Sequence, residues 1–177
     1  IVSPDEVLPR HKFEAIDLKD FDLAAIRGAL QSFGADDRFD AVAVAVLDHG
    51  FPPRGVSNRL FRFQYLRGLM GENSTLGAFA HLAAELPAPL TRMKAVAKTA
   101  GEDMPVLLMD TGAAAALGAL QDAAVAKHDR VLTVNLGNAH TVAFHLEGLK
   151  VIGFLEHHTN LLNGARIDDL IDKLARG

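Results

Sequence analysis

The chain contains no cysteine among its 177 residues. Without thiolates it cannot form a disulfide, a zinc ribbon or a cysteine-ligated iron–sulfur cluster, and it has no cysteine nucleophile. Any chemistry must therefore use histidine, carboxylates, hydroxyls or the backbone.

Long hydrophobic runs and an excess of positive charge are also missing. The longest apolar runs, near residues 41–47 and 111–120, fall short of the roughly 18–20 residues that a membrane span needs. Eighteen basic residues against 22 acidic ones give a net charge of −4, which disfavours general nucleic-acid binding. No signal-peptide pattern opens the chain. We therefore expect no membrane partner and a cytoplasmic location.

The composition, 49% hydrophobic and 23% charged, is typical of a globular chain, and its periodicity predicts an α/β fold. We expect the first helix to be capped by Asp17 or Asp20 and the last by Asn163. The first strand should be buried on both faces. In the helix 59–70 we expect Leu60 and Phe63 to face inward, with Tyr65 and Leu66 as further inward candidates. The predicted helices are 20–33, 59–70, a short one within 74–86, 91–100, 113–126 and 165–175, and the predicted strands are 39–47, 106–109, 131–136, 140–146 and 151–155.

The segment 131–144 is a hydrophobic strand that enters a tight turn at Gly137 and Asn138. Such a turn lets backbone N–H groups point at an anion such as phosphate, and Thr141 adds a hydroxyl. An ordinary β-hairpin favours the same residues for backbone reasons, so the pattern alone leaves both interpretations open.

Asp48 and His49 follow the first predicted strand, where ligand crevices of α/β sheets occur. Asp48 is a candidate general base and His49 a candidate proton relay. An ordinary turn into Gly50 explains Asp48 equally well. Asp110 lies in a similar place after the strand 106–109, and we expect it to cap the next helix.

Basic and aromatic side chains alternate between residues 54 and 67 without an acidic residue. Arg54 and Arg59 are the candidates for binding a substrate phosphate or carboxylate. Single-stranded nucleic acid is an alternative ligand, and a solvated helix face with its aromatic residues in the core is a third interpretation. The pattern consists of Arg54, Arg59, Phe61, Arg62, Phe63, Tyr65 and Arg67.

The eight histidines match no established metal-binding motif. On a strand, His140 and His145 are separated by an odd number of residues and point to opposite faces. The adjacent His157 and His158 diverge in the same way. We therefore expect no metal site.

The order of an alanine-rich helix, a linker and the segments 131–144 and 148–154 resembles the centre of the actin-like ATPase and sugar-kinase superfamily. In that superfamily the corresponding strand carries Asp-x-Gly-x-x-x-Thr, the second phosphate loop. This sequence has Asn135-x-Gly137-x-x-x-Thr141, and asparagine cannot act as a charged metal ligand or base. The first phosphate loop and the glycine-rich adenosine segment are absent from these residues.

The resemblance implies a ribonuclease H-like fold and a small phosphorylated ligand, with ATP and Mg²⁺ as cofactors. We expect 1–128 to be the later half of a first lobe and 129–177 the first half of a second lobe, as the central part of a longer protein. Strand edges left by such a split favour a homodimer. The residues implied for phosphate or nucleotide binding are Asp110, Asn135, Gly137, Asn138, His140 and Thr141, and the catalytic candidates are Asp48 and His49.

A closer resemblance, over about residues 39–162, is to a prokaryotic family whose members carry the label "putative pyruvate formate-lyase activating enzyme". A genuine activase of that kind holds a [4Fe–4S] cluster through cysteine thiolates, and this sequence has none. Either a missing part of the protein carries the cysteines or the label is wrong, and we favour the latter. The predicted function is nucleotide or phosphometabolite binding, as a phosphotransferase or ATPase, or as a non-catalytic sensor or scaffold with a decayed phosphate loop.

Overall fold

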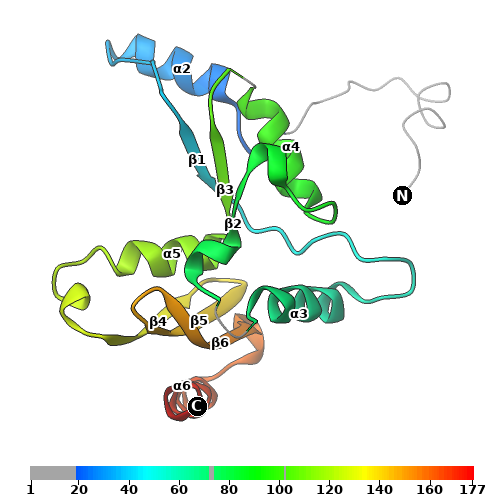
Figure 1. Cartoon of the computed structure of the whole chain (residues 1–177), viewed down its shortest axis with the longest axis vertical. Helices are drawn as coiled ribbons and strands as arrows, with labels where there is room; N and C mark the ends of the chain where they lie inside the picture. Colours follow the sequence, from blue (N-terminus) through cyan, green and yellow to red (C-terminus); the bar gives the residue numbers. More distant parts are fainter. Residues whose placement is uncertain (1–18, 72–73, 102) are drawn as a thin grey trace.

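Two small three-stranded sheets form the framework of the chain (Figure 1). The computed structural model describes residues 19–71, 74–101 and 103–177, so Asp17, a candidate helix cap, lies outside the described residues. The first sheet is built from residues before position 110 and the second from residues after position 129. The α/β class expected from the sequence is confirmed, whereas a ribonuclease H-like arrangement stays a prediction.

The first sheet has the strand order β1-β3-β2. β1 (Val42–Ala45) pairs in parallel with β3 (Val106–Met109), and β2 (Ala80–Leu82) pairs antiparallel with the other edge of β3. Helix α4 (Thr91–Ala100) packs on one face of this sheet, while α2 (Leu23–Ser32) lies near its far end. The core between the sheet and α4 consists of Val46, Leu90, Met93, Val96, Ala100, Val106 and Leu108.

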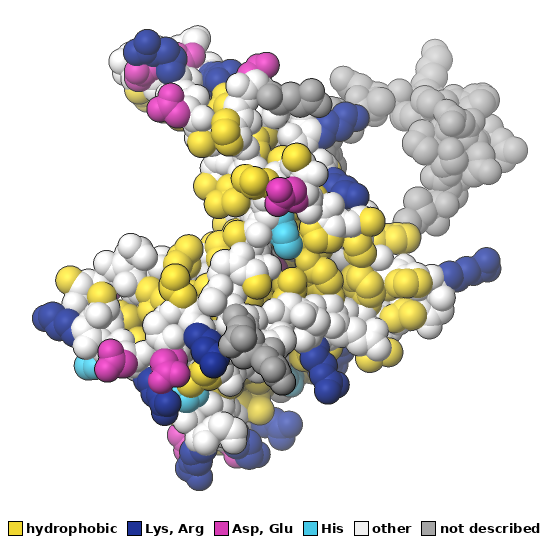
Figure 2. Space-filling view, viewed as in Figure 1, with side chains coloured by type: hydrophobic (Ala, Val, Ile, Leu, Met, Phe, Trp, Pro, Cys, Tyr) yellow, Lys and Arg dark blue, Asp and Glu magenta, His cyan; other side chains and the backbone are white. Residues whose placement is uncertain are grey.

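The opposite face of the first sheet is open. β1 alternates between half-buried and exposed residues, and Leu107 of β3 is 39% exposed. A groove of about 430 Å³ runs between this face and α5 (Thr111–Ala119), and hydrophobic side chains gather at the narrowing there (Figure 2). The prediction that the first strand is buried on both faces is therefore wrong, because α4 covers one face only.

The segment 74–86 does not form the predicted helix. It makes a 3-10 turn, η1 (Leu76–Phe79), then β2, then a second 3-10 turn, η2 (Ala83–Glu85). Leu76 and Phe79 are almost completely buried, and the backbone N–H of Leu76 donates to the carbonyl of Leu149 in the second sheet. Pairing with both sheets replaces the helical hydrogen bonds here, so tertiary contacts override local propensity.

The second sheet is the predicted three-stranded meander. β4 (Arg130–Leu136), β5 (His140–Glu147) and β6 (Lys150–His158) pair antiparallel in this order. Helix α6 (Gly164–Arg176) packs on one face, and Asn163 caps it by accepting the N–H of Arg166 at 2.9 Å, as predicted. On the other face lie α5, shorter than the predicted 113–126, and α3 (Asn58–Leu69).

A second core joins the two halves of the chain. Phe79 meets Phe144 edge-on, with ring centroids 5.6 Å apart, and Phe154 packs on Phe144 at 4.9 Å. Residues from both sides of the expected boundary between 128 and 129 therefore share one core. Its buried members are Leu66, Leu76, Phe79, Met109, Ala113, Ala116, Val142, Phe144 and Leu146.

The buried face of α3 differs from the prediction. Leu66 is buried, in line with the sequence, but Leu60 and Phe63 are 51% and 44% exposed, and the charged Arg62 is buried instead. The helix turns Arg62 inward because partners for its guanidinium lie there, as described below. The cap of α2 also differs from the expectation, since Asp22, rather than Asp20, accepts the N–H of Ala25.

Among the helices of the described ranges, none has the length and apolarity that crossing a membrane requires.

Candidate functional site

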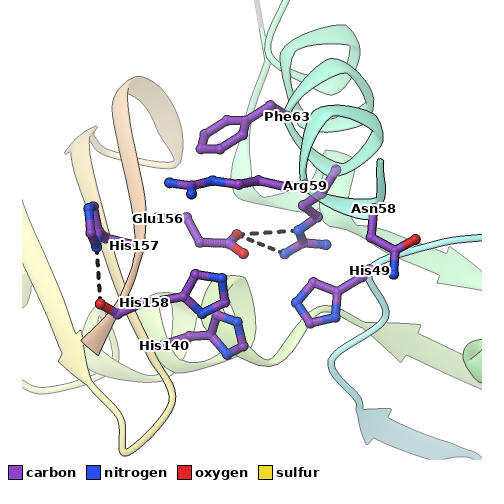
Figure 3. Close-up of a pocket in the computed structure, with 9 residues that line it drawn as sticks. His49, Asn58, Arg59, Phe63, His140, Glu156, His157 and His158 are labelled. Carbon is purple, nitrogen blue, oxygen red and sulfur yellow. Dashed lines mark hydrogen bonds and ion pairs between the residues drawn. The ribbon is translucent and has the colours of Figure 1, made fainter. Parts of the chain in front are cut away.

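A cavity of about 280 Å³ lies where the first turns of α3 meet the loop after β1 and the β5–β6 pair (Figure 3). Most of its lining side chains are polar or ionisable, and histidine is the most frequent residue type. The lining consists of His49, Asn58, Arg59, Arg62, Phe63, His140, Glu156, His157 and His158.

The register of the second sheet brings three of these side chains to one face. His140, the first residue of β5, pairs with His158, and Val142 pairs with Glu156. Since side chains two residues apart share a face of a strand, Glu156 and His158 lie on the face that His140 occupies. The rings of His140 and His158 have their centroids 4.8 Å apart.

His49 reaches the cavity from the loop after β1, which Asp48 holds in place. The buried Asp48 carboxylate accepts the N–H of Gly50 through Oδ1 and the N–H of Met93 through Oδ2, each at 2.8 Å. Gly50 has a φ of +74°, and a Cβ there would lie 2.5 Å from the ring of Phe61. A turn with this conformation and this close contact requires glycine. Asp48 therefore acts as a positioning group for its neighbour His49.

Arg62 connects three segments of the chain beneath the cavity. Its Nη1 donates to the carbonyl of Asp48 at 2.9 Å, and its Nη2 donates to Oδ2 of Asp110 at 2.8 Å. Nη2 and Nε also donate to Oε2 of Glu156, at 3.1 and 3.3 Å. With all three nitrogens of the guanidinium engaged, this buried cation is matched by partners, as burial of a charge requires.

The charges in the cavity act on its ionisable groups. Burial lowers the pKa of His49, and the positive charge of Arg62 lowers it further, against the opposing effect of Glu156. This shift favours the neutral imidazole of His49, which can accept a proton or donate a lone pair. For Arg62, burial acts to lower the pKa, but the charges of Asp110 and Glu156 outweigh it and raise the pKa.

Three of the candidate residues from the sequence lie together in the cavity, namely His49, Arg59 and His140. Arg54 is exposed in the loop before α3 and does not line it. Asp110 caps α5 as expected, since its Oδ1 accepts the N–H of Gly112 at 3.0 Å, while its Oδ2 binds Arg62.

The remaining residues of the expected phosphate loop lie elsewhere. Thr141 is buried, and its hydroxyl lies 3.0 Å from that of Thr159, which donates to the carbonyl of Gly137 at 2.6 Å. Asn138 is exposed in the β4–β5 turn, and Asn135 lines a separate cavity of about 360 Å³ beside α5. The hairpin is thus closed by its own hydroxyl contacts.

Glu156 and His158 did not emerge from the sequence as site residues. Counting the register outward from the turn at Gly148 would pair His140 with His157 and place Glu156 on the other face of the sheet. The register shifts by one residue between His145 and Leu146, and this shift brings His158 and Glu156 to the face of His140. The sequence gives no local signal for this shift, nor for the inward position of Arg62. The prediction of no metal site compared histidines close together in the sequence, His140 with His145 and His157 with His158, whereas the structure places the distant His49 and Glu156 beside His140.

Comparison with known proteins gives one match. No curated protein and no solved structure matches the chain. The model of one family, described as "Putative pyruvate format-lyase activating enzyme (DUF1786)", matches residues 2–177. Because this match extends over nearly every residue, the chain belongs to that family.

Proposed function

We propose that the chain binds a small phosphorylated metabolite in the cavity between α3 and the β5–β6 pair. One observation carries the proposal: Arg59 lines the cavity and makes no ion pair within the described residues, whereas Arg62 is fully engaged by its neighbours. An arginine without a carboxylate partner beside three or more imidazoles is suited to bind a phosphate through paired N–H groups.

The position of α3 favours the same ligand. Asn58 and Arg59 are the first two residues of this helix, and both line the cavity. Ser57 caps the helix by accepting the N–H of Leu60 at 3.2 Å. The positive end of the helix dipole therefore faces the cavity and attracts a negative group.

The size of the cavity favours a compact ligand. Pockets for drug-sized ligands measure about 300–1,000 Å³, and this one measures about 280 Å³. A phosphoryl group with a short carbon skeleton fits this volume better than a complete nucleotide does. ATP with Mg²⁺, the cofactor pair that the resemblance implies, is the second ligand to test.

The histidines supply proton-transfer groups for an enzymatic version of this function. If a phosphate ester is bound at Arg59, the neutral His49 is the candidate base for an attacking water, and His140 is the candidate acid for the leaving oxygen. Phosphoryl transfer or hydrolysis is the reaction class that these groups support. A non-catalytic sensor would use the same cavity for binding alone.

The family description does not guide this proposal. An activating enzyme of that description holds an iron–sulfur cluster through cysteine thiolates, and these residues contain none. The donors that converge on the cavity are imidazoles and a carboxylate, which do not fit such a cluster.

Calorimetry with the purified chain tests the proposal. We expect inorganic phosphate and a three-carbon phosphate monoester to bind wild type, and Arg59→Ala to lose at least tenfold in affinity. Arg54→Ala removes an equal charge outside the cavity and is the matched control, which we expect to bind as wild type does. Equal losses in the two variants, or no binding to wild type, would contradict the proposal.

The same samples distinguish the remaining alternatives. Release of phosphate from the ester or from Mg-ATP supports an enzyme, and binding without turnover supports a sensor. The alternating arginine and aromatic residues are less suited to single-stranded nucleic acid than the sequence alone suggests, because Arg62, in the middle of the pattern, is buried. Binding of a single-stranded oligonucleotide with a steep salt dependence, retained in Arg59→Ala, would favour that alternative over the metabolite.

We also propose a homodimer formed through a strand edge. β1 is an edge strand of the first sheet, and β4 is an edge strand of the second. The free N–H and C=O groups along such an edge can pair with a second copy of the chain. Light scattering at high protein concentration should report twice the monomer mass, and a monomer would contradict the proposal.

A further inference from the structure

We propose that His49, His140 and Glu156 bind a divalent transition-metal ion, with Zn²⁺ preferred, and that the open side of the ion faces the cavity. One ligand atom from each residue lies within 4.8 Å of the other two. The inference goes beyond phosphate binding and does not depend on it.

The ligand atoms are available for a metal. The ring nitrogens of His49 and His140 make no hydrogen bond to another described residue, although both rings are partly buried. Glu156 receives both of its hydrogen bonds from Arg62 on Oε2, which leaves Oε1 for a further ligand. In Figure 3 the two imidazoles and this carboxylate converge on the same part of the cavity.

Arg62 orients the carboxylate of Glu156 by hydrogen bonds to Oε2, as residues that bond to metal ligands do in metal sites. It holds Oε2 of Glu156 at 3.1 Å from Nη2 and is itself anchored by Asp110 and by the carbonyl of Asp48. Hydrogen bonds of this kind orient a ligating carboxylate before the metal arrives. The carboxylate of Glu156 is therefore already held in one orientation before the ion binds, so binding does not have to meet the entropic cost of ordering it.

The charge balance beneath the cavity favours a cation. Arg62 carries one positive charge and contacts two carboxylates, those of Asp110 and Glu156. These three side chains together have one negative charge in excess. A divalent ion coordinated by Oε1 of Glu156 would compensate that charge at short range.

The donor set selects the class of metal. Two imidazoles and one carboxylate are the ligands of catalytic zinc sites and of related first-row ions, whereas Mg²⁺ prefers oxygen ligands alone. In tetrahedral Zn²⁺ coordination, ligand atoms lie about 3.3 Å apart, so the side chains must close by roughly 1.5 Å through rotation. Three protein ligands leave the fourth position to water, with His158 as the nearest further imidazole.

A metal at this position would act beside Arg59. Arg59 lines the same cavity, so the ion and the guanidinium would both attract an anion bound between them. With the ion bound, His49 and His140 would serve as its ligands rather than as base and acid, and water on a zinc ion of this type, whose pKa is lowered to about 7, would supply the attacking oxygen. The chemical class of ligand expected at the open position is therefore a phosphate or carboxylate oxygen.

Calorimetry with chelator-treated protein tests the inference directly. We expect one equivalent of Zn²⁺ per chain to bind. His49→Ala and His140→Ala should each lose at least about 100-fold in affinity, since loss of a group that only hydrogen-bonds to a metal ligand already costs about 10–100-fold. His128→Ala removes an exposed histidine outside the cavity and should bind as wild type does. Circular dichroism spectra of the variants establish that they are folded.

A spectroscopic measurement on the unmodified chain complements the variants. Co²⁺ bound in a low-symmetry site with nitrogen and oxygen ligands should give visible absorption bands, which Zn²⁺ then displaces. The inference is overturned if neither ion binds at one equivalent, if Mg²⁺ binds in preference to Zn²⁺, or if folded His49→Ala and His140→Ala proteins bind Zn²⁺ as wild type does. Zinc binding without phosphate binding would contradict only the proposed function.

Discussion

The imidazole rings of His49 and His140 lie with their centroids 5.1 Å apart and their planes tilted by 50°. The first ring comes from the loop after β1 and the second from the first residue of β5. Two separate sequence motifs, one after β1 and one at the start of β5, thus contribute side chains to one cavity. This contact depends on Arg62, which joins the loop that carries His49 to the strand that carries Glu156.

We predict that Arg62→Met destabilises the chain by about 3–5 kcal/mol, because it leaves the buried carboxylates of Asp110 and Glu156 without their shared cation. Urea unfolding followed by circular dichroism measures the change. Arg67→Met, at an exposed position on the same helix, is the control and should change stability by less than about 0.5 kcal/mol. Similar effects in the two variants would contradict the role given to Arg62.

A second prediction concerns the turn that carries His49. Gly50→Ala and Gly55→Ala both place a Cβ at positive φ, which costs about 1–2 kcal/mol. Only at position 50 would the Cβ also meet the ring of Phe61, which adds about 1–3 kcal/mol. We expect Gly50→Ala to be the less stable variant in urea unfolding and to weaken ligand binding in the cavity. Equal stabilities would show that Phe61 moves aside freely.

The role of Asp48 gives a third prediction. Asp48→Asn keeps one acceptor oxygen and loses the other, so one of the N–H groups of Gly50 and Met93 loses its partner. We expect a loss of stability of about 1–3 kcal/mol. Asp36→Asn, at an exposed pair with Arg38, should have almost no effect in the same unfolding experiment. An Asp48→Asn protein that is as stable as wild type but no longer releases phosphate from a substrate of the wild type would instead favour a catalytic role for Asp48.

A fourth prediction concerns pH. Burial lowers the pKa of His81, whose Nε2 lies 3.4 Å from the hydroxyl of Tyr65. The unfolded chain therefore takes up a proton at this histidine at higher pH than the folded chain does. The contribution of His81 to the free energy of unfolding is complete above the pKa of the unfolded chain, about 6.5. It is lost as the pH falls from this pKa toward the lower pKa of the folded chain.

His81→Asn should consequently lose less stability than wild type between pH 7.5 and 5.5. Urea unfolding at the two pH values measures this difference. His128→Asn, at an exposed position, should keep the wild-type dependence. If the two variants show the same dependence on pH, His81 is not the group responsible.

The elements that could be predicted from the sequence are those with local signals. Helix α4 ends at Gly101 as expected, Asn163 caps α6, and the turns at Gly137 and Gly148 separate the strands of the meander. Each depends on a cap, a turn residue or a periodic stripe within a few neighbouring positions. Such signals do not require knowledge of what packs against the element.

The parts that could not be predicted depend on distant contacts. The segment 74–86 forms hydrogen bonds with both sheets. Arg62 turns inward because it forms buried ion pairs with Asp110 and Glu156. Because arginine in a helix is usually exposed to solvent, the sequence of α3 predicts an exposed Arg62 rather than a buried one. The candidate site was found in part for the same reason: His49 and His140 carry local motifs, whereas Glu156 acquires its place only from the strand register.

The bond between Arg62 and Glu156 spans 94 positions of the chain. During synthesis the cavity cannot exist until β6 has left the ribosome, because Glu156, His157 and His158 in its lining belong to that strand. Contacts of such long sequence separation also form late in refolding, since closing the intervening loop has an entropic cost. A ligand of this cavity would therefore bind only chains that have been synthesised through β6 and have paired it with β5, and its binding would distinguish these from partly folded ones.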